Sequence, residues 1–389
     1  MSQMDKTGQA NKMSNRTKTL RDAKRIVVKI GSAVLTTSEG INLGLICRLA
    51  DQLATLHERG VDIVLVSSGA VAAGRETIPT GHKLNDLPAR QAASSIGQSR
   101  LMHEYDETFR RFGLVSSQIL LTRDDLKHRD RFLNVRNTLS RLLEWRGIPI
   151  INENDTVAVQ ELEFGDNDTL ASLILNVVEA DLFINLTSAD GVFDKNPDSN
   201  DNAKHLSYID NIGSLDLDAM CDGKTAVGSG GMFSKMRAAH RAAQLGVPTL
   251  ILAGRERMII ERVFSGEECG TWIVPDEKSV SRRKFWLAYH CDPAGDLVID
   301  KGAEKALMAG GKSLLPAGIS SVIGTFKAGE LVRVVAMDGK PLAVGLSSYG
   351  SEDMAKILGH KSDKIETILG KCPFPEAIHR DNLLLDAAL

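Results

Sequence analysis

Long apolar runs and paired cysteines are what this sequence lacks. Its longest apolar stretches, residues 61–66 and 148–151, fall far short of the roughly 20 residues that span a bilayer. The five cysteines are odd in number, widely spaced and never in a CxxC pair, which argues against a disulfide framework and a zinc site. We therefore expect a soluble protein of the reducing cytoplasm with no membrane partner.

A surplus of charge of one sign is missing as well. The formal net charge is −3, from 47 basic and 50 acidic residues, so nothing global indicates binding to nucleic acid or to an anionic membrane. The first 24 residues are polar and basic and lack the apolar segment that a secretory signal needs. We interpret residues 1–24 as a disordered polar tail; an organellar targeting segment is the alternative.

What is present is a regular alternation of strand and helix patterns. Residues 25–30 are apolar and β-branched, residues 46–57 carry apolar side chains at helical spacing, and residues 61–66 indicate a buried strand. The alternation continues with helices at 89–112, 130–145, 168–180 and 232–245 and strands at 114–121, 148–151, 181–186 and 247–252. It is typical of parallel strands joined by crossover helices, so we expect an α/β domain with a mostly parallel open sheet, ending near residue 275.

The pattern changes beyond residue 276. Short strand-like pieces are separated by glycines at positions 310, 318, 324, 329 and 345. Frequent glycine breaks suit a small β-rich domain better than further crossover units. We place the boundary between residues 276 and 293.

Polar residues follow four of the predicted strands at the point where each strand ends. These segments are KIGS at 29–32, SSGA at 67–70, NEND at 152–155 and TSAD at 187–190. In an open parallel sheet, ligands bind beyond the carboxyl ends of the strands. A helix cap or a turn would explain one such segment equally well, but four at one sheet edge predict a ligand site.

A glycine-rich turn, GSGGMFSK at residues 228–235, precedes a predicted helix. Its glycines let backbone N–H groups approach phosphate oxygens, while the helix N-terminus and Lys235 supply positive charge. The turn lacks the Walker A spacing, and Phe233 stands at the last glycine position of GxGxxG. Asp168 lies at the start of another predicted helix. Both segments suit a phosphorylated ligand.

The ordered set of motifs indicates a family. VVKIGS at 27–32, VSSGAVAAGR at 66–75, INENDTVA at 151–158, FGDNDTL at 164–170 and GSGGMFSK at 228–235 resemble the signature stretches of the glutamate 5-kinases, in the amino acid kinase superfamily. The resemblance implies a three-layer αβα sandwich with a mostly parallel open sheet at 25–275 and a linker at 276–293. A small β-rich barrel of the PUA type at 294–372 and a C-terminal tail at 373–389 would follow.

The same resemblance implies roles for individual residues. The phosphates of ATP would be bound by Lys29 and by the loop formed by Ser229, Gly230, Gly231, Met232, Phe233, Ser234 and Lys235, with Thr187 and Ser188 beside the nucleotide. The substrate would be held by Ser68, Asp155 and Asn167. Asp168 would orient Lys29 and Lys235, and these three residues would carry catalysis. Ser188 stands where aspartate is common in the family and Ser229 where threonine is, so we expect altered nucleotide preference at most.

The implied reaction is phosphorylation of the γ-carboxylate of L-glutamate by ATP, the first step of proline biosynthesis. A glutamate side chain has a reference pKa of about 4.3, so the nucleophile is already an anion at neutral pH and needs no general base. A catalytic histidine is therefore not expected. Mg²⁺ would arrive on the nucleotide, and Lys29 and Lys235 would spread positive charge around the transferring phosphoryl group.

The alternatives within the superfamily are kinases of N-acetylglutamate, aspartate or uridylate, but the β-rich C-terminal domain and the INENDTVA and FGDNDTL motifs favour free glutamate. The resemblance also implies feedback inhibition by proline at or overlapping the glutamate site. We further expect a homo-oligomer and contact with glutamyl phosphate reductase, which would receive the labile product. For the C-terminal domain, RNA binding is the alternative to a structural or regulatory role. We favour the latter because acidic residues interleave with its lysines.

Overall fold

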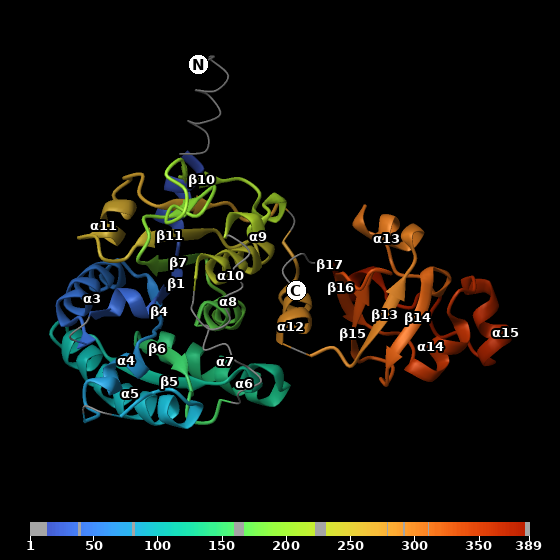
Figure 1. Ribbon diagram of the computed structural model, residues 1–389, viewed down its shortest axis with the longest axis horizontal. Coiled ribbons are helices and arrows are strands. Elements are labelled where there is room, and N and C mark those ends of the chain that lie inside the picture. The colour runs from blue at the N-terminus through green and yellow to red at the C-terminus, as the bar shows by residue number, and fades with distance from the viewer. Residues whose placement is uncertain are drawn as a thin grey trace, which may run out of the picture. The chain divides into compact units, whose positions relative to one another are not determined.

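The computed structural model describes residues 14–37, 40–79, 82–158, 167–221, 231–277, 279–290, 292–309 and 311–385. The chain divides into two compact units, Met1–Ser279 and Val280–Leu389 (Figure 1). Each unit has its own sheet and its own apolar core.

The first unit is built on one large sheet with the strand order β10-β12-β11-β7-β1-β4-β6-β5. The strands are β1 (Arg25–Ile30), β4 (Asp62–Val66), β5 (Ser116–Leu121), β6 (Ile148–Glu153), β7 (Leu182–Thr187), β10 (Tyr208–Ile209), β11 (Thr249–Ala253) and β12 (Thr271–Ile273). Neighbouring strands pair in parallel, except that β11 and β12 are antiparallel. The mostly parallel open sheet predicted from the sequence is confirmed.

Helices cover both faces of this sheet, as Figure 1 shows. One face carries α3 (Leu43–Glu58), α5 (Leu87–Arg110) and α11 (Ile259–Phe264), and the other carries α7 (Arg129–Glu144), α8 (Asn167–Val178) and α10 (Met232–Gln244). Shorter elements complete the unit: α2 (Ser32–Leu35), α4 (Ala70–Arg75), α6 (Arg123–Lys127), α9 (Leu217–Met220), the β2–β3 pair (Thr36–Thr37, Gly40–Ile41) and the β8–β9 pair (Val192–Phe193, His205–Leu206). The three-layer αβα arrangement is therefore confirmed.

The alternation of side chains along β1 decides which residues reach which layer. Ile26, Val28 and Ile30 belong to the core formed with α3 and α5. Because successive side chains in a strand point to opposite faces, Val27 and Lys29 point to the side covered by α8. The Lys29 side chain therefore points into the layer between the sheet and α8.

The expected N-terminal tail differs from what the structure describes. Residues 14–22 are helical, and Leu20 and Ala23 are buried. The Arg16 guanidinium donates to the carbonyl oxygens of Glu267 and Cys269, both at 3.3 Å, and lies 5.8 Å from the centre of the Trp272 ring. These contacts bind the segment to the first unit, so the prediction of a disordered tail does not hold for residues 14–24.

The second unit contains a five-stranded sheet with the order β14-β13-β15-β16-β17. Its strands are β13 (Gly295–Ile299), β14 (Ile319–Gly324), β15 (Leu331–Val335), β16 (Pro341–Leu346) and β17 (Leu383–Leu385), and its helices are α12 (Arg282–His290), α13 (Lys301–Met308), α14 (Ser351–Ile357) and α15 (Ile365–Leu369). The expected β-rich second domain is present.

Two segments expected to lie outside this domain contribute to it. The predicted linker contains α12, in which Phe285 and Tyr289 are buried with their ring centres 4.6 Å apart. The predicted C-terminal tail supplies β17, which pairs with β16, and the buried side chains of Ala377 and Ile378. Both segments are too short to show a clear period, so only packing reveals their place.

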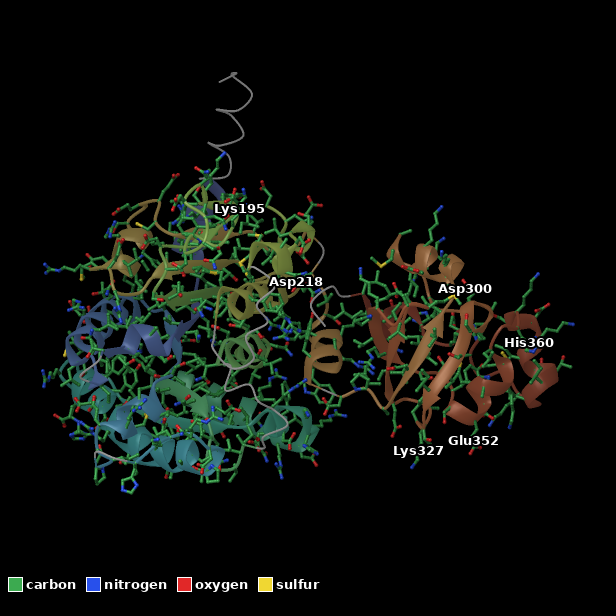
Figure 2. The ribbon with its side chains drawn as sticks, in the orientation of Figure 1. Lys195, Asp218, Asp300, Lys327, Glu352 and His360 are labelled. Atoms are coloured by element: carbon green, nitrogen blue, oxygen red, sulfur yellow. The ribbon has the colours of Figure 1, made fainter. Side chains whose placement is uncertain are left out.

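Charges of both signs lie on the surface of the second unit. Arg333 forms two hydrogen bonds of 2.8 Å with the carboxylate of Asp296. In Figure 2, Lys327 and Glu352 project from the same edge of this unit. A structural or regulatory role stays the prediction for this domain, with RNA binding as the alternative. Among the described helices, none is both long and apolar enough to cross a membrane.

Candidate active site

The carboxyl ends of the central strands bring polar side chains to one edge of the sheet. Lys29 lies near the end of β1, Ser68 lies two residues beyond β4, Asn152 lies near the end of β6, and Thr187 ends β7. Because β1 pairs in parallel with both β4 and β7, and β4 with β6, these ends meet at the same edge. The clustering predicted from the sequence is thus present.

Two lysines and one aspartate form a buried charge cluster at this edge. The Lys29 Nζ lies 2.6 Å from Asp168 Oδ1, and the Lys235 Nζ lies 3.2 Å from Asp168 Oδ2. Lys29 is 3%, Lys235 5% and Asp168 0% exposed. With two ammonium groups and one carboxylate, the cluster carries a net charge of +1 and is suited to an anionic ligand.

Neutral donors complete the surroundings of the Asp168 carboxylate. Ser234 Oγ donates to Oδ2 at 2.7 Å, and Asn185 Nδ2 donates to Oδ1 at 2.8 Å. Burial by itself would raise the pKa of Asp168, but the two lysines and the hydrogen bond from Ser234 outweigh it and lower the pKa to about 2. Asp168 is therefore ionised at neutral pH and can hold both lysines.

The start of α10 supplies Lys235. Gly231 is the N-cap residue, and the Lys235 Nζ also donates to the Gly231 carbonyl oxygen at 3.4 Å. Met232 packs against the core below α10, and Phe233 lies beside Arg237, whose guanidinium carbon is 5.9 Å from the ring centre. The unpaired N–H groups of this helix end favour an anion. Two further predicted phosphate-binding residues, Ser229 and Gly230, lie outside the described residues.

A chain of amide side chains forms the second part of the site. Asn167 Nδ2 donates to Ser68 Oγ at 3.1 Å and to Asn152 Oδ1 at 3.0 Å, and Asn152 Nδ2 donates to Gln98 Oε1 at 2.8 Å. Ser68 and Asn167, two predicted substrate ligands, are therefore in direct contact.

The direction of this chain is fixed by one backbone group. The Glu153 N–H donates to Asn152 Oδ1 at 2.9 Å, and because a backbone N–H can only donate, the accepting atom must be the amide oxygen. Each following amide then has one allowed orientation. Gln98 Nε2 and Asn167 Oδ1 remain at the two ends, buried and without a hydrogen-bond partner among the described residues. Asn167 thus offers an acceptor, which suits an ammonium group.

Asp155 lies three residues beyond Asn152 and accepts a short hydrogen bond from Ser94 Oγ. Burial raises the pKa of Asp155, and the hydrogen bond from Ser94 only partly opposes this effect. Ser94 and Gln98 come from α5, which packs closely on α4 because Gly97 has no side chain. A Cβ atom at Gly97 would lie 1.8 Å from the Ala70 carbonyl oxygen.

The two residues expected beside the nucleotide lie at the end of β7 and directly after it. Thr187 is buried and its carbonyl oxygen accepts a hydrogen bond from the Gly254 N–H at 2.8 Å, whereas Ser188 is exposed. In the part of the chain described here, no group of three or more His, Cys, Asp or Glu residues could hold a metal ion.

Several polar residues of the site were missed by sequence reasoning. Ser94 and Gln98 lie in a helix whose pattern gives no sign of a site, and Asn152 was noticed only as part of a polar strand end. Asn185 lies in a strand whose six residues are all buried. An amide within an otherwise apolar run was a signal that could have identified it.

Comparison with known proteins shows which families this chain resembles. A model of the amino acid kinase family matches residues 24–253, and a model of the PUA domain matches residues 295–369. A protein named glutamate 5-kinase from Maridesulfovibrio salexigens is 86% identical over 377 residues, covering 97% of this chain and 100% of that protein. Proteins of the same name from Oleidesulfovibrio alaskensis and Geobacter sulfurreducens are 59% and 47% identical; the alignments cover 97% and 94% of this chain and 99% and 98% of those proteins.

Proposed function

Because this chain belongs to the amino acid kinase family and, within it, to the glutamate 5-kinases, we propose that it phosphorylates the γ-carboxylate of L-glutamate with ATP. The product is L-glutamyl 5-phosphate, formed in the first step of proline biosynthesis. The observation that carries the proposal at residue level is the buried cluster of Lys29, Asp168 and Lys235 beside a chain of amides.

The cluster meets the main electrostatic demand of the reaction. The attacking carboxylate and the triphosphate are both anions, so positive charge must be held where they meet. Lys29 and Lys235 supply this charge, and Asp168 fixes the position of each ammonium group. Because these groups are already in place before substrate binds, little reorganisation is needed during transfer.

The triphosphate of ATP binds across Lys29 and the start of α10. The start of α10, from Gly231 to Lys235, supplies backbone donors, and Thr187 and Ser188 lie on the nucleotide side at the end of β7. The one carboxylate of the cluster is engaged with both lysines, so the described residues fit a Mg²⁺ ion that would be held by the phosphates of the nucleotide and not by a protein ligand set of its own. Mg²⁺ supplies further neutralisation of phosphate charge when it is bound.

Free glutamate is held through its α-groups. Asn167 Oδ1, which has no partner, and Asp155 accept hydrogen bonds from the α-ammonium group, while Ser68 donates to the α-carboxylate. An N-acetylated substrate has no ammonium group for these acceptors, so the arrangement supports free glutamate. Proline shares the α-nitrogen and the α-carboxylate, and we propose that it inhibits by binding at an overlapping site.

The cellular setting belongs to the same proposal. The enzyme works in the cytoplasm as a homo-oligomer, and the labile acyl phosphate passes to glutamyl phosphate reductase. The PUA domain has a structural or regulatory role, which the mixed charges on its surface support better than they support RNA binding.

A direct assay tests the reaction and the acceptor together. ADP release is measured with MgATP and either L-glutamate, N-acetylglutamate, L-aspartate or UMP, and hydroxylamine traps any acyl phosphate as a hydroxamate. We expect hydroxamate from L-glutamate alone, lost in Lys235→Ala and kept in Lys24→Ala, which removes an exposed lysine just before β1. Preference for another acceptor would overturn the substrate assignment, and full activity of Lys235→Ala would overturn the catalytic assignment.

A further inference from the structure

Asn185 is a polar side chain in the centre of an apolar strand. It lies in β7 between Ile184 and Leu186 and is 0% exposed. In the parallel pairing of β1 with β7, its direct neighbour is Lys29. Neighbours in register point to the same face of a sheet, so Asn185 and Lys29 both face the layer that contains Asp168.

The contact between Asn185 and Asp168 is specific. Asn185 Nδ2 donates to Oδ1 at 2.8 Å, the same oxygen that lies 2.6 Å from the Lys29 Nζ. On the other oxygen, Oδ2, Ser234 Oγ donates at 2.7 Å beside Lys235 at 3.2 Å. Each carboxylate oxygen therefore receives one cation and one neutral donor.

Stability does not account for an amide at this position. Asn185 Oδ1 is buried and has no hydrogen-bond partner in the part of the chain that the structure describes. A buried acceptor without a partner is unfavourable, whereas an apolar side chain of similar size would fit the core between Ile184 and Leu186. The strand thus retains a polar group that a purely structural strand would lose.

Charge explains why the group is an amide. An acidic residue at position 185 would reduce the net charge of the cluster from +1 to 0 and weaken its attraction for phosphate, because the cluster holds two lysines and one aspartate. An amide gives Asp168 a donor and leaves that charge unchanged.

We propose that Asn185 is a positioning residue that fixes the Asp168 carboxylate and, through it, the direction of Lys29 toward the transferring phosphoryl group. This inference rests on the proposed role of Asp168. Asn185 itself touches neither substrate in this assignment. Its loss should therefore reduce turnover with little effect on the binding of either substrate.

The first test separates turnover from stability. Asn185→Leu should lower kcat about tenfold, since a hydrogen bond to a buried charge is lost, while KM for ATP and for glutamate changes less than about twofold. The melting temperature is measured in parallel: loss of the hydrogen bond to Asp168 lowers it, and removal of the unpaired oxygen offsets part of that loss. Unchanged kcat, or a fall in kcat that only follows a loss of folded protein, would overturn the proposal.

The second test uses the pH profile. The charged side chains that the described residues place against Asp168 are Lys29 from β1 and Lys235 from α10. In Asn185→Asp the new carboxyl can donate to Asp168 only while it is protonated, so kcat should fall as the pH rises through a range in which the wild-type enzyme is constant. A wild-type pH profile in this variant would overturn the proposal.

A matched control is available on the neighbouring strand. Thr249 in β11 is 1% exposed, its Oγ1 also has no partner, and it pairs in register with Phe183 rather than with a residue of the cluster. Thr249→Val should leave kcat and its pH profile unchanged. Lys235→Ala distinguishes failure of the catalytic cluster from failure of the role of Asn185. If Lys235→Ala is active, the proposed catalytic cluster is refuted. If Lys235→Ala is inactive but Asn185→Leu is fully active, only the role of Asn185 is refuted.

Discussion

Replacing Asp168 with asparagine should destabilise the first unit strongly, because it leaves two buried ammonium groups without their counterion. At the observed separations of 2.6 and 3.2 Å, Coulomb's law with an effective dielectric constant of about 20 gives attractions of about 6 and about 5 kcal/mol. Desolvation of the three groups offsets much of this sum. Removing one partner of a buried ion pair typically costs about 3–5 kcal/mol, and we expect Asp168→Asn to lie in that range at neutral pH.

The effect of pH distinguishes this explanation from a general packing defect. In the variant, the folded state favours loss of a proton from one of the two crowded lysines, whereas the unfolded state keeps both protons. Because the unfolded state then binds more protons, the stability of Asp168→Asn should increase as the pH rises from about 7 toward about 10. The wild-type protein should not show this gain. Guanidinium unfolding followed by circular dichroism at several pH values measures the free energy of unfolding of the variant and of the wild-type protein, and how each depends on pH.

Asp62 provides a matched control in the same sheet. Its carboxylate also joins two cations, Arg25 at 2.9 Å and Arg146 at 3.0 Å, but it keeps 21% of its side chain exposed and lies at the start of β4, away from the site. Asp62→Asn should cost only about 1 kcal/mol and leave activity unchanged, because exposed ion pairs are weak. If Asp168→Asn were no less stable than Asp62→Asn, or showed no recovery with rising pH, the reasoning would be refuted.

Three further predictions concern the amino acid site, the helix packing and the N-terminal helix. Burial raises the pKa of Asp155, so this carboxyl takes up a proton at a higher pH than an ordinary aspartate; as the pH is lowered, KM for glutamate should therefore begin to rise before the pH reaches the ordinary aspartate pKa of about 3.9, and Asp155→Asn should have a high, constant KM. Gly97→Ala places a Cβ atom 1.8 Å from the Ala70 carbonyl oxygen and should cost about 1–3 kcal/mol in unfolding, whereas Gly44→Ala, with its nearest atom at 3.5 Å, should be neutral or stabilising. Arg16→Ala removes two hydrogen bonds to backbone carbonyls and should lower the free energy of unfolding by about 1–2 kcal/mol, while substrate KM values stay constant.

The architecture of the first unit could be predicted because its sequence pattern is local and repeated. Buried parallel strands need continuous apolar runs, and crossover helices need an apolar face, so each element is visible within a short window. The N-terminal helix and α12 were not predicted from the sequence, for the opposite reason. They are short and polar overall, and only contact with distant residues, such as that of Arg16 with Cys269, shows where they belong.

The sequence by itself determined the sheet, the edge at which polar strand ends gather, the family, and the identity of Lys29, Asp168 and Lys235 as candidates. The pairing of both lysines with Asp168 was expected from the resemblance; tertiary structure alone decided the burial and distances of these groups, and that Asn185 approaches Asp168 from a strand more than 15 residues further along the chain. The reason is physical. Composition and period fix which face of an element is apolar, whereas the distance between two polar atoms depends on the register and packing of elements remote in sequence.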